Sequence, residues 1–178
     1  MRHVNAKLIE RFADLAARRL PGQWVIFGGA ALPLMGITTR TTLDIDVAGP
    51  TDLPMAATLA VMEIAQELGL PVESVNQAGA FFLRRVDGWE QRLVLVRRGR
   101  KGSVWRPDAT LFILLKLGRL TETDLQDCLD VLALPERERE PVDSDSVCTA
   151  VRAQLRRKHG RERKRRLQKL LVALSAPG

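Results

Sequence analysis

The sequence has few of the residues that build disulfide, zinc or histidine-dependent sites. It contains two cysteines and two histidines in 178 residues. Cys128 and Cys148 have neither zinc-ligand spacing nor the pattern of a disulfide framework, so we expect free thiols in a reducing compartment. His3 and His159 belong to no Ser/His/Asp or zinc pattern. The chemistry of this chain is therefore not expected to depend on either residue type.

Long apolar runs are also missing. No uninterrupted apolar segment approaches the ~18 residues of a membrane-spanning helix, and residues 1–12 carry charges where a signal peptide would be apolar. Hydrophobic residues still make up 46% of the chain, which is enough for a buried core. These features predict a globular cytoplasmic protein without a membrane partner.

Positive charge is abundant and unevenly distributed. The formal net charge is +7, and most of the excess lies in residues 136–178. Such a cluster favours a polyanionic partner, with RNA before DNA, although a solvated surface, an acidic protein partner or acidic lipid would also accommodate it. The candidate nucleic-acid contacts are Arg156, Arg157, Lys158, Arg163, Lys164, Arg165 and Arg166.

Hydrophobic periodicity predicts alternating helices and strands along most of the chain. The predicted helices are 4–19, 30–35, 51–68, 107–120, 121–134, 145–158 and 161–174. The predicted strands are 24–27, 43–47, 81–86 and 90–96, with a hairpin turn at Asp87-Gly88. This order indicates an α/β or α+β fold with a small mixed sheet flanked by helices. Residues 1–135 would form the core and residues 136–178 a basic helical C-terminal extension.

The tripeptide Asp44-Ile45-Asp46 is the most informative for chemistry. On a strand, residues two apart point to the same face, so both carboxylates would lie side by side while Leu43, Ile45 and Val47 face the core. Adjacent carboxylates repel each other, and a hard divalent ion such as Mg²⁺ (or Mn²⁺) relieves the repulsion. Such an ion bridges nucleotide phosphates in phosphoryl and nucleotidyl transfer. The alternative is an acidic pair that is merely exposed on an edge strand.

A glycine pair precedes this tripeptide. Gly28 and Gly29 lie at a predicted turn from strand to helix, where glycine lets the backbone approach a phosphate. Arg40 and Thr42, just before the acidic strand, could add a phosphate clamp and a hydroxyl contact. An ordinary tight turn and a solvated loop are the alternatives.

The segment FGGAALPLMGITTRTTLDIDV resembles the signature of the DNA polymerase beta-like nucleotidyltransferase superfamily, and in particular the branch with abortive-infection toxin nucleotidyltransferases. The resemblance implies transfer of a nucleoside monophosphate from an NTP to an acceptor, here RNA such as tRNA, with Asp44 and Asp46 binding the metal. It also implies that Lys116 contacts the nucleotide phosphates, and that Asp124 or Asp127 corresponds to a later acidic residue.

The sequence departs from this family in one mechanistically important place. Members usually carry a third carboxylate on a later strand, and the expected strand, Arg92–Val96, has none. Glu90, at its beginning, is the only substitute. Because the third acid helps to complete the metal site and to deprotonate the acceptor, its absence leaves a second hypothesis. The chain would then be a catalytically degenerate binding module, acting as a nucleic-acid-binding regulator or a toxin–antitoxin component with a partner protein.

Overall fold

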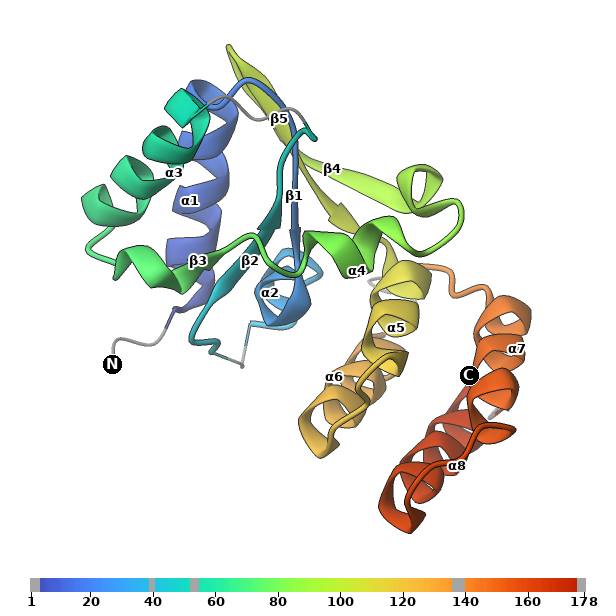
Figure 1. Ribbon diagram of the computed structural model, residues 1–178. Helices are drawn as coiled ribbons and strands as arrows, with labels where there is room; N and C mark the ends of the chain where they lie inside the picture. Colours follow the sequence, from blue (N-terminus) through green and yellow to red (C-terminus); the bar gives the residue numbers. More distant parts are fainter. Residues whose placement is uncertain (1–3, 39–40, 52–54, 136–139, 176–178) are drawn as a thin grey trace. The chain divides into compact units, whose positions relative to one another are not determined.

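The computed structural model describes residues 4–38, 41–51, 55–135 and 140–175. It divides the chain into two compact units, Met1–Pro107 and Asp108–Gly178. The first unit holds a mixed sheet with helices, and the second is helical (Figure 1). The predicted α+β class with a small mixed sheet is therefore confirmed. The predicted division at residues 135/136 falls inside the second unit.

The sheet of the first unit has five strands in the order β3-β2-β1-β5-β4 (Figure 1). Strand β1 runs antiparallel to β2 and parallel to β5, β3 is parallel to β2, and β4 is antiparallel to β5. The strands are β1 (Gly22–Phe27), β2 (Ile45–Ala48), β3 (Val75–Asn76), β4 (Leu93–Arg98) and β5 (Gly102–Pro107). β1 and β2 lie next to each other in the sheet. They match the two strands predicted at residues 24–27, before the glycine pair, and 43–47, around the acidic tripeptide.

Helices α1 (Ala6–Arg19) and α3 (Met55–Glu67) lie on the same side of the sheet (Figure 1). Their apolar faces and alternate residues of the central strands form one buried cluster. The strand members of the cluster include Trp24, Ile26, Ile45 and Val47. Since successive strand residues face opposite sides, the residues between them point to the other face of the sheet.

Two short helices complete the first unit. They are α2 (Ala31–Leu34), which continues from a 3-10 turn at Gly28–Ala30, and α4 (Ala80–Arg84). Further 3-10 turns span Val72–Ser74 and Trp89–Arg92.

The hairpin prediction was wrong in position. Residues 81–86 form no strand but belong to α4 and the turn after it, and the hairpin joins β4 to β5 instead. The physical reason is visible in the burial: Ala80 and Leu83 are buried, which is helical spacing, while Phe81 and Phe82 between them are exposed. Gly88 does adopt a positive φ of 71°, yet it leads into a 3-10 turn.

The second unit consists of α5 (Ala109–Leu117), α6 (Glu122–Leu132), α7 (Ser144–Leu155) and α8 (Arg161–Ser175). α5 packs on α6 and α7, and α6 packs on α8. The predicted capping box at the start of α6 is present, because the side chains of Thr121 and Asp124 each accept the other's backbone N–H. α7 and α8 therefore belong to the same compact unit as α5 and α6, which the sequence analysis had assigned to the core. Across the described ranges, no helix has the length and apolar character needed to cross a membrane.

Candidate active site

Asp46 lies in the middle of β2, between two fully buried core residues. Ile45 and Val47 are 0% exposed, and Asp46 is half-buried on the opposite face of the sheet. Asp44 is exposed and precedes the strand. The expectation that Leu43 faces the core was wrong, since this side chain is 43% exposed.

The cause of this exposure is a turn held by Thr42. Its hydroxyl donates to the carbonyl of Asp44 (3.2 Å) and accepts from the backbone N–H of Asp44 (3.4 Å), which bends the chain at Leu43. Thr42 is itself tied to the chain start by backbone hydrogen bonds with Val4 of 2.8 and 3.1 Å. The position of Asp44 is thus held by the side-chain hydrogen bonds of Thr42 and by the backbone hydrogen bonds between Thr42 and Val4.

The glycine turn lies directly against the acidic strand. Phe27, the last residue of β1, pairs with Asp46, so Gly28 follows immediately beside the carboxylate. Gly28 has a φ of +64°, and a Cβ at this position would collide with Oδ2 of Asp46. Both the backbone conformation and the contact therefore require glycine.

Gly29 is similarly close to Thr42. A Cβ at Gly29 would lie 3.2 Å from Oγ1 of Thr42, tighter than an ordinary contact. The structure therefore brings together five of the predicted site residues, which are Gly28, Gly29, Thr42, Asp44 and Asp46. Arg40, the predicted phosphate clamp, lies outside the described residues.

A buried arginine that the sequence analysis missed supports the helix behind the glycine turn. Arg106, on β5, is 8% exposed, and its Nε donates to the carbonyl of Leu34 at the end of α2 (2.9 Å). The one sequence signal for its burial is its position two residues after the apolar Val104, which places both side chains on the same face of β5.

The strand next to the acidic strand is β3, which the sequence did not predict. Asp46 pairs with Asn76 across the parallel β2–β3 ladder, so an amide stands beside the carboxylate. Oδ1 of Asn76 accepts the backbone N–H of Ala78 (2.9 Å). With only two residues, β3 is too short for a period-2 pattern to reveal.

The strand expected to hold a third carboxylate is β4, at the far edge of the sheet, separated from β2 by β1 and β5. β4 itself carries no carboxylate, as the sequence analysis stated. Within the described ranges, no group of three or more His, Cys, Asp or Glu residues could hold a metal ion, so Glu90 does not join Asp44 and Asp46.

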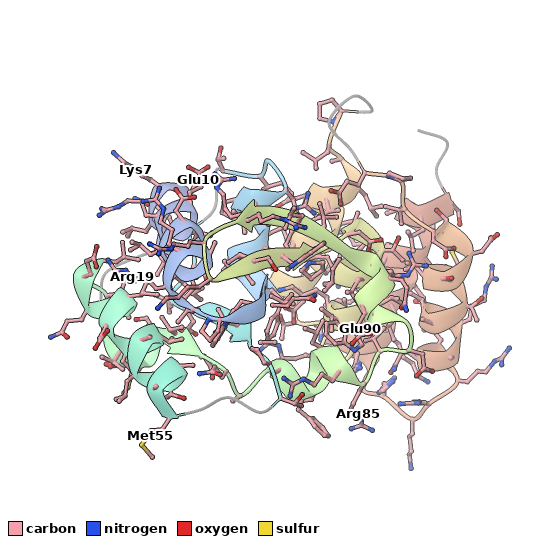
Figure 2. The ribbon with its side chains drawn as sticks, turned by 90° about the horizontal axis from the view of Figure 1, so that it is seen from above. Lys7, Glu10, Arg19, Met55, Arg85 and Glu90 are labelled. Atoms are coloured by element: carbon pink, nitrogen blue, oxygen red, sulfur yellow. The ribbon has the colours of Figure 1, made fainter. Side chains whose placement is uncertain are left out.

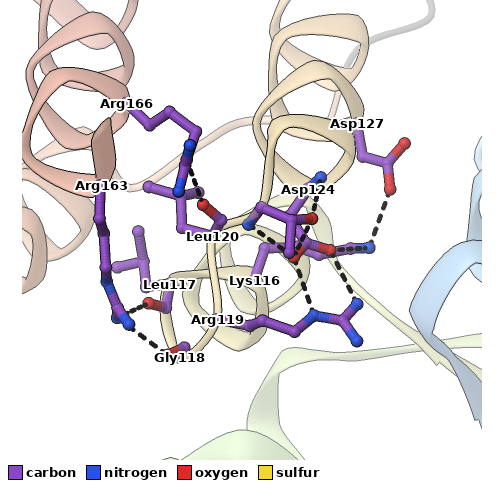
Figure 3. A network of polar contacts seen from close by, with 10 residues as sticks. Lys116, Leu117, Gly118, Arg119, Leu120, Asp124, Asp127, Arg163 and Arg166 are labelled. Atoms are coloured by element: carbon purple, nitrogen blue, oxygen red, sulfur yellow. Dashed lines mark hydrogen bonds and ion pairs between the residues drawn. The ribbon is translucent and has the colours of Figure 1, made fainter. Parts of the chain in front are cut away.

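Lys116, the predicted phosphate contact, lies on α5 in the second unit and binds two carboxylates of α6 (Figure 3). Its Nζ is 2.9 Å from Oδ1 of Asp124 and 2.8 Å from Oδ2 of Asp127. Both aspartate side chains are 1% exposed and that of Lys116 is 11% exposed. The ammonium is thus already neutralised inside its own unit, and its contact with nucleotide phosphates stays a prediction.

Asp124 is the centre of this cluster. It also accepts hydrogen bonds from Arg119 (3.1 and 3.2 Å) and from the backbone and hydroxyl of Thr121 (2.9 and 2.8 Å). Burial raises the pKa of Asp124, but the hydrogen bonds from Arg119, Lys116 and Thr121 outweigh it and hold that pKa well below its usual range. Nearby, burial raises the pKa of the Cys128 thiol to about 12.

Two of the predicted nucleic-acid contacts, Arg163 and Arg166, form hydrogen bonds within the second unit. Nη2 of Arg163 donates to the carbonyls of Leu117 (2.9 Å) and Gly118 (2.8 Å), and Nε of Arg166 donates to that of Leu120 (2.7 Å; Figure 3). These are carbonyls at and after the end of α5, which its own helix leaves without partners. The remaining candidates, Arg156, Arg157, Lys158, Lys164 and Arg165, are exposed.

A family model matches residues 6–149, which is most of the chain, and its description is "Nucleotidyltransferase of unknown function (DUF6036)". The chain belongs to this family. The match includes both the glycine turn and the acidic strand, and the resemblance to the nucleotidyltransferase superfamily is confirmed. The toxin-like branch stays a prediction. No curated protein and no solved structure gives a significant match.

Proposed function

We propose that this protein is a metal-dependent nucleotidyltransferase that moves a nucleoside monophosphate from an NTP to RNA. The observation that carries the proposal is the contact between the glycine turn and the acidic strand. Gly28 has no side chain where one would meet the Asp46 carboxylate, so the backbone of the glycine turn lies directly against that carboxylate. Family membership supports the same reaction class.

The donor set fits Mg²⁺ or Mn²⁺. Asp44 and Asp46 supply carboxylate oxygens, which hard divalent ions prefer, and no cysteine or histidine of the described residues forms a metal-binding group with them. A bound Mg²⁺ would supply a bridge to the nucleotide phosphates and stabilise the charge that develops on them. Two protein carboxylates suffice for this, because Mg²⁺ commonly completes its shell with water and substrate phosphate.

The chain's own groups would position the nucleotide. The backbone around Gly28 and Gly29 would approach the triphosphate, and Thr42 would orient Asp44 through its two hydrogen bonds. We propose Arg40 and Lys116 as further phosphate contacts. In the reaction, an acceptor hydroxyl oxygen bonds to the α-phosphorus, the bond from that phosphorus to the bridging oxygen breaks, pyrophosphate leaves and the hydroxyl proton passes to solvent.

RNA is proposed as the acceptor because of the basic surface of the second unit. Exposed side chains from the end of α7 to α8 carry positive charge on Arg156, Arg157, Lys158, Lys164 and Arg165. Contacts of this kind hold a phosphate backbone without reading its sequence.

Label transfer tests the proposal. The protein is incubated with each α-labelled NTP, Mg²⁺ or Mn²⁺, and total RNA, beside the variant Asp44→Asn/Asp46→Asn. Label on RNA that needs both the metal and the two aspartates is the expected result. If no label were transferred with any NTP or either metal while NTP binding stayed intact, the proposed transferase activity would be contradicted.

Asn76 favours a second candidate, a nucleotide-binding module that has lost catalysis. An amide beside Asp46 cannot accept the acceptor's proton as a carboxylate does. The variant Asn76→Asp separates the two, since it places a third acid beside Asp46. Transfer that appears only in Asn76→Asp would assign the natural chain to the binding module.

A further inference from the structure

Two adjacent phenylalanines on α4 are exposed beside the candidate active site. Phe81 is 60% and Phe82 66% exposed, although α4 has a buried side formed by Ala80 and Leu83. Single exposed apolar residues are common, but two neighbouring aromatic rings form a continuous apolar surface that usually has a partner. The rings lie edge to face, with centroids 5.8 Å apart.

A cation accompanies the rings. The guanidinium carbon of Arg85 lies 5.1 Å from the centroid of the Phe81 ring, within the range of a cation–π contact. Arg84, on the same short helix, is exposed as well. The surface made by Phe81, Phe82 and Arg85, which we call the α4 platform, thus combines aromatic rings with positive charge.

The α4 platform is fixed to the strand that carries Asp46. Nη2 of Arg84 donates to the carbonyl of Gly49, just after β2, at 2.7 Å. At the other end of α4, a Cβ on Gly79 would lie 4.0 Å from Oδ1 of Asp46 and would press on the ring of Phe27. The platform therefore begins two residues from a backbone position that adjoins the catalytic carboxylate.

We propose that the α4 platform binds an unpaired base of the acceptor RNA and thereby presents the acceptor to the active site. An aromatic ring stacks on any base that is not paired, and a nearby arginine contacts the phosphate that follows it. The triphosphate of the NTP already has its expected contacts at the glycine turn and the acidic strand. The charge of Arg85 therefore matches the acceptor better than the nucleotide. The inference rests on the proposed function for its choice of substrate.

The test measures RNA binding by the full chain in EDTA and without NTP, so that it does not depend on catalysis. Fluorescence anisotropy follows a short labelled single-stranded RNA and the same strand annealed to its complement. Phe82→Ala should weaken binding of the single strand about tenfold or more, which is typical of losing one base–aromatic stack. It should change duplex binding little, and Phe82→Trp should keep the wild-type affinity.

Met55→Ala is the matched control, because Met55 is 81% exposed on α3 and lies well apart from Arg85 in the first unit (Figure 2). This variant should bind the single strand as the wild type does. Arg85→Gln should lower the slope of log affinity against log salt by about 0.7, the share of one phosphate contact on a single strand.

Unchanged single-strand affinity in Phe82→Ala would overturn the inference, and so would an equal loss for single strand and duplex. A loss of NTP affinity with intact RNA binding would also overturn it and assign the platform to the incoming nucleotide. A Phe82-dependent dimer in sedimentation, with RNA binding unaffected, would assign the surface to a second copy of the chain. A selective loss of single-strand binding would support the platform even if label transfer failed, in which case only the enzyme proposal would fall.

Discussion

Two pairs of aspartates in this chain have opposite surroundings. Asp124 and Asp127 are 1% exposed and hold Lys116 between them, whereas Asp44 is exposed and Asp46 half-buried beside a glycine turn. A buried carboxylate pair needs a permanent cation, because leaving it without one costs several kcal/mol. A pair at the surface can instead take an exchangeable ion. The comparison teaches that burial commits the first pair to an internal ion pair, whereas the second pair has the exposure that the proposed metal site requires.

The largest expected difference between the pairs is in stability. Asp124→Ala should lower the free energy of unfolding by about 3–5 kcal/mol, because it removes one of the two carboxylates that bind Lys116, the carboxylate that Arg119 contacts and the cap of α6. Asp44→Ala, the matched control, should change it by less than about 0.5 kcal/mol. Urea unfolding of both variants measures the difference, and equal losses would remove the distinction.

The glycine turn gives the next largest effect. Gly28→Ala should cost about 2 kcal/mol or more, since it adds a clash with Asp46 to the strain of a positive φ. Gly36→Ala separates the two contributions, because Gly36 has a φ of +94° with nothing near its Cβ position, and it should cost only about 1 kcal/mol. Thermal or urea unfolding measures both. Similar losses would mean that the contact with Asp46 adds nothing.

The low pKa of Asp124 predicts a specific pH dependence. Because its pKa is lower in the folded chain than the ordinary value of about 3.9 in the unfolded chain, the carboxylate stabilises the fold above that value. The stabilisation is lost as the pH falls below it towards the folded pKa. Unfolding free energies of the wild type should therefore fall more steeply between about pH 5 and pH 3 than those of Asp124→Asn. Parallel curves would contradict the assignment.

The smallest expected effects distinguish two neighbours on α8. Arg163→Gln should cost about 1 kcal/mol of stability, because its hydrogen bonds to the carbonyls of Leu117 and Gly118 are lost. It should leave the salt dependence of RNA binding unchanged. Lys164→Gln should do the reverse, with unchanged stability and a salt slope lower by about 0.7. If both variants altered only the slope, the helix-end role of Arg163 would be wrong.

The parts of the fold with strong local patterns could be predicted from the sequence. The apolar run before Gly28 and the alternation around Ile45 predicted the two central strands, and the spacing of Thr121 and Asp124 predicted a capping box that the structure confirms. These features depend on neighbours within a few residues, which a linear sequence records.

The parts that depend on distant partners were missed. β3 has two residues and exists because it pairs with β2, so the position of Asn76 beside Asp46 had no local signal. The segment with Phe81 and Phe82 has enough apolar residues for a strand, and only the burial of Leu83 with Ala80 shows that it is a helix. The charge of Arg163 likewise gave no indication of the helix end that it contacts.

The most direct test of the central claim is Mn²⁺ binding measured by electron paramagnetic resonance with a non-hydrolysable NTP analogue. The wild type should bind Mn²⁺ together with the analogue, and Asp124→Asn should bind it as well, provided that it is folded. Asp44→Asn/Asp46→Asn should lose the bound signal, because these carboxylates supply the proposed ligands. Equal Mn²⁺ binding in the wild type and Asp44→Asn/Asp46→Asn would contradict the claim that the exposed pair is a metal site.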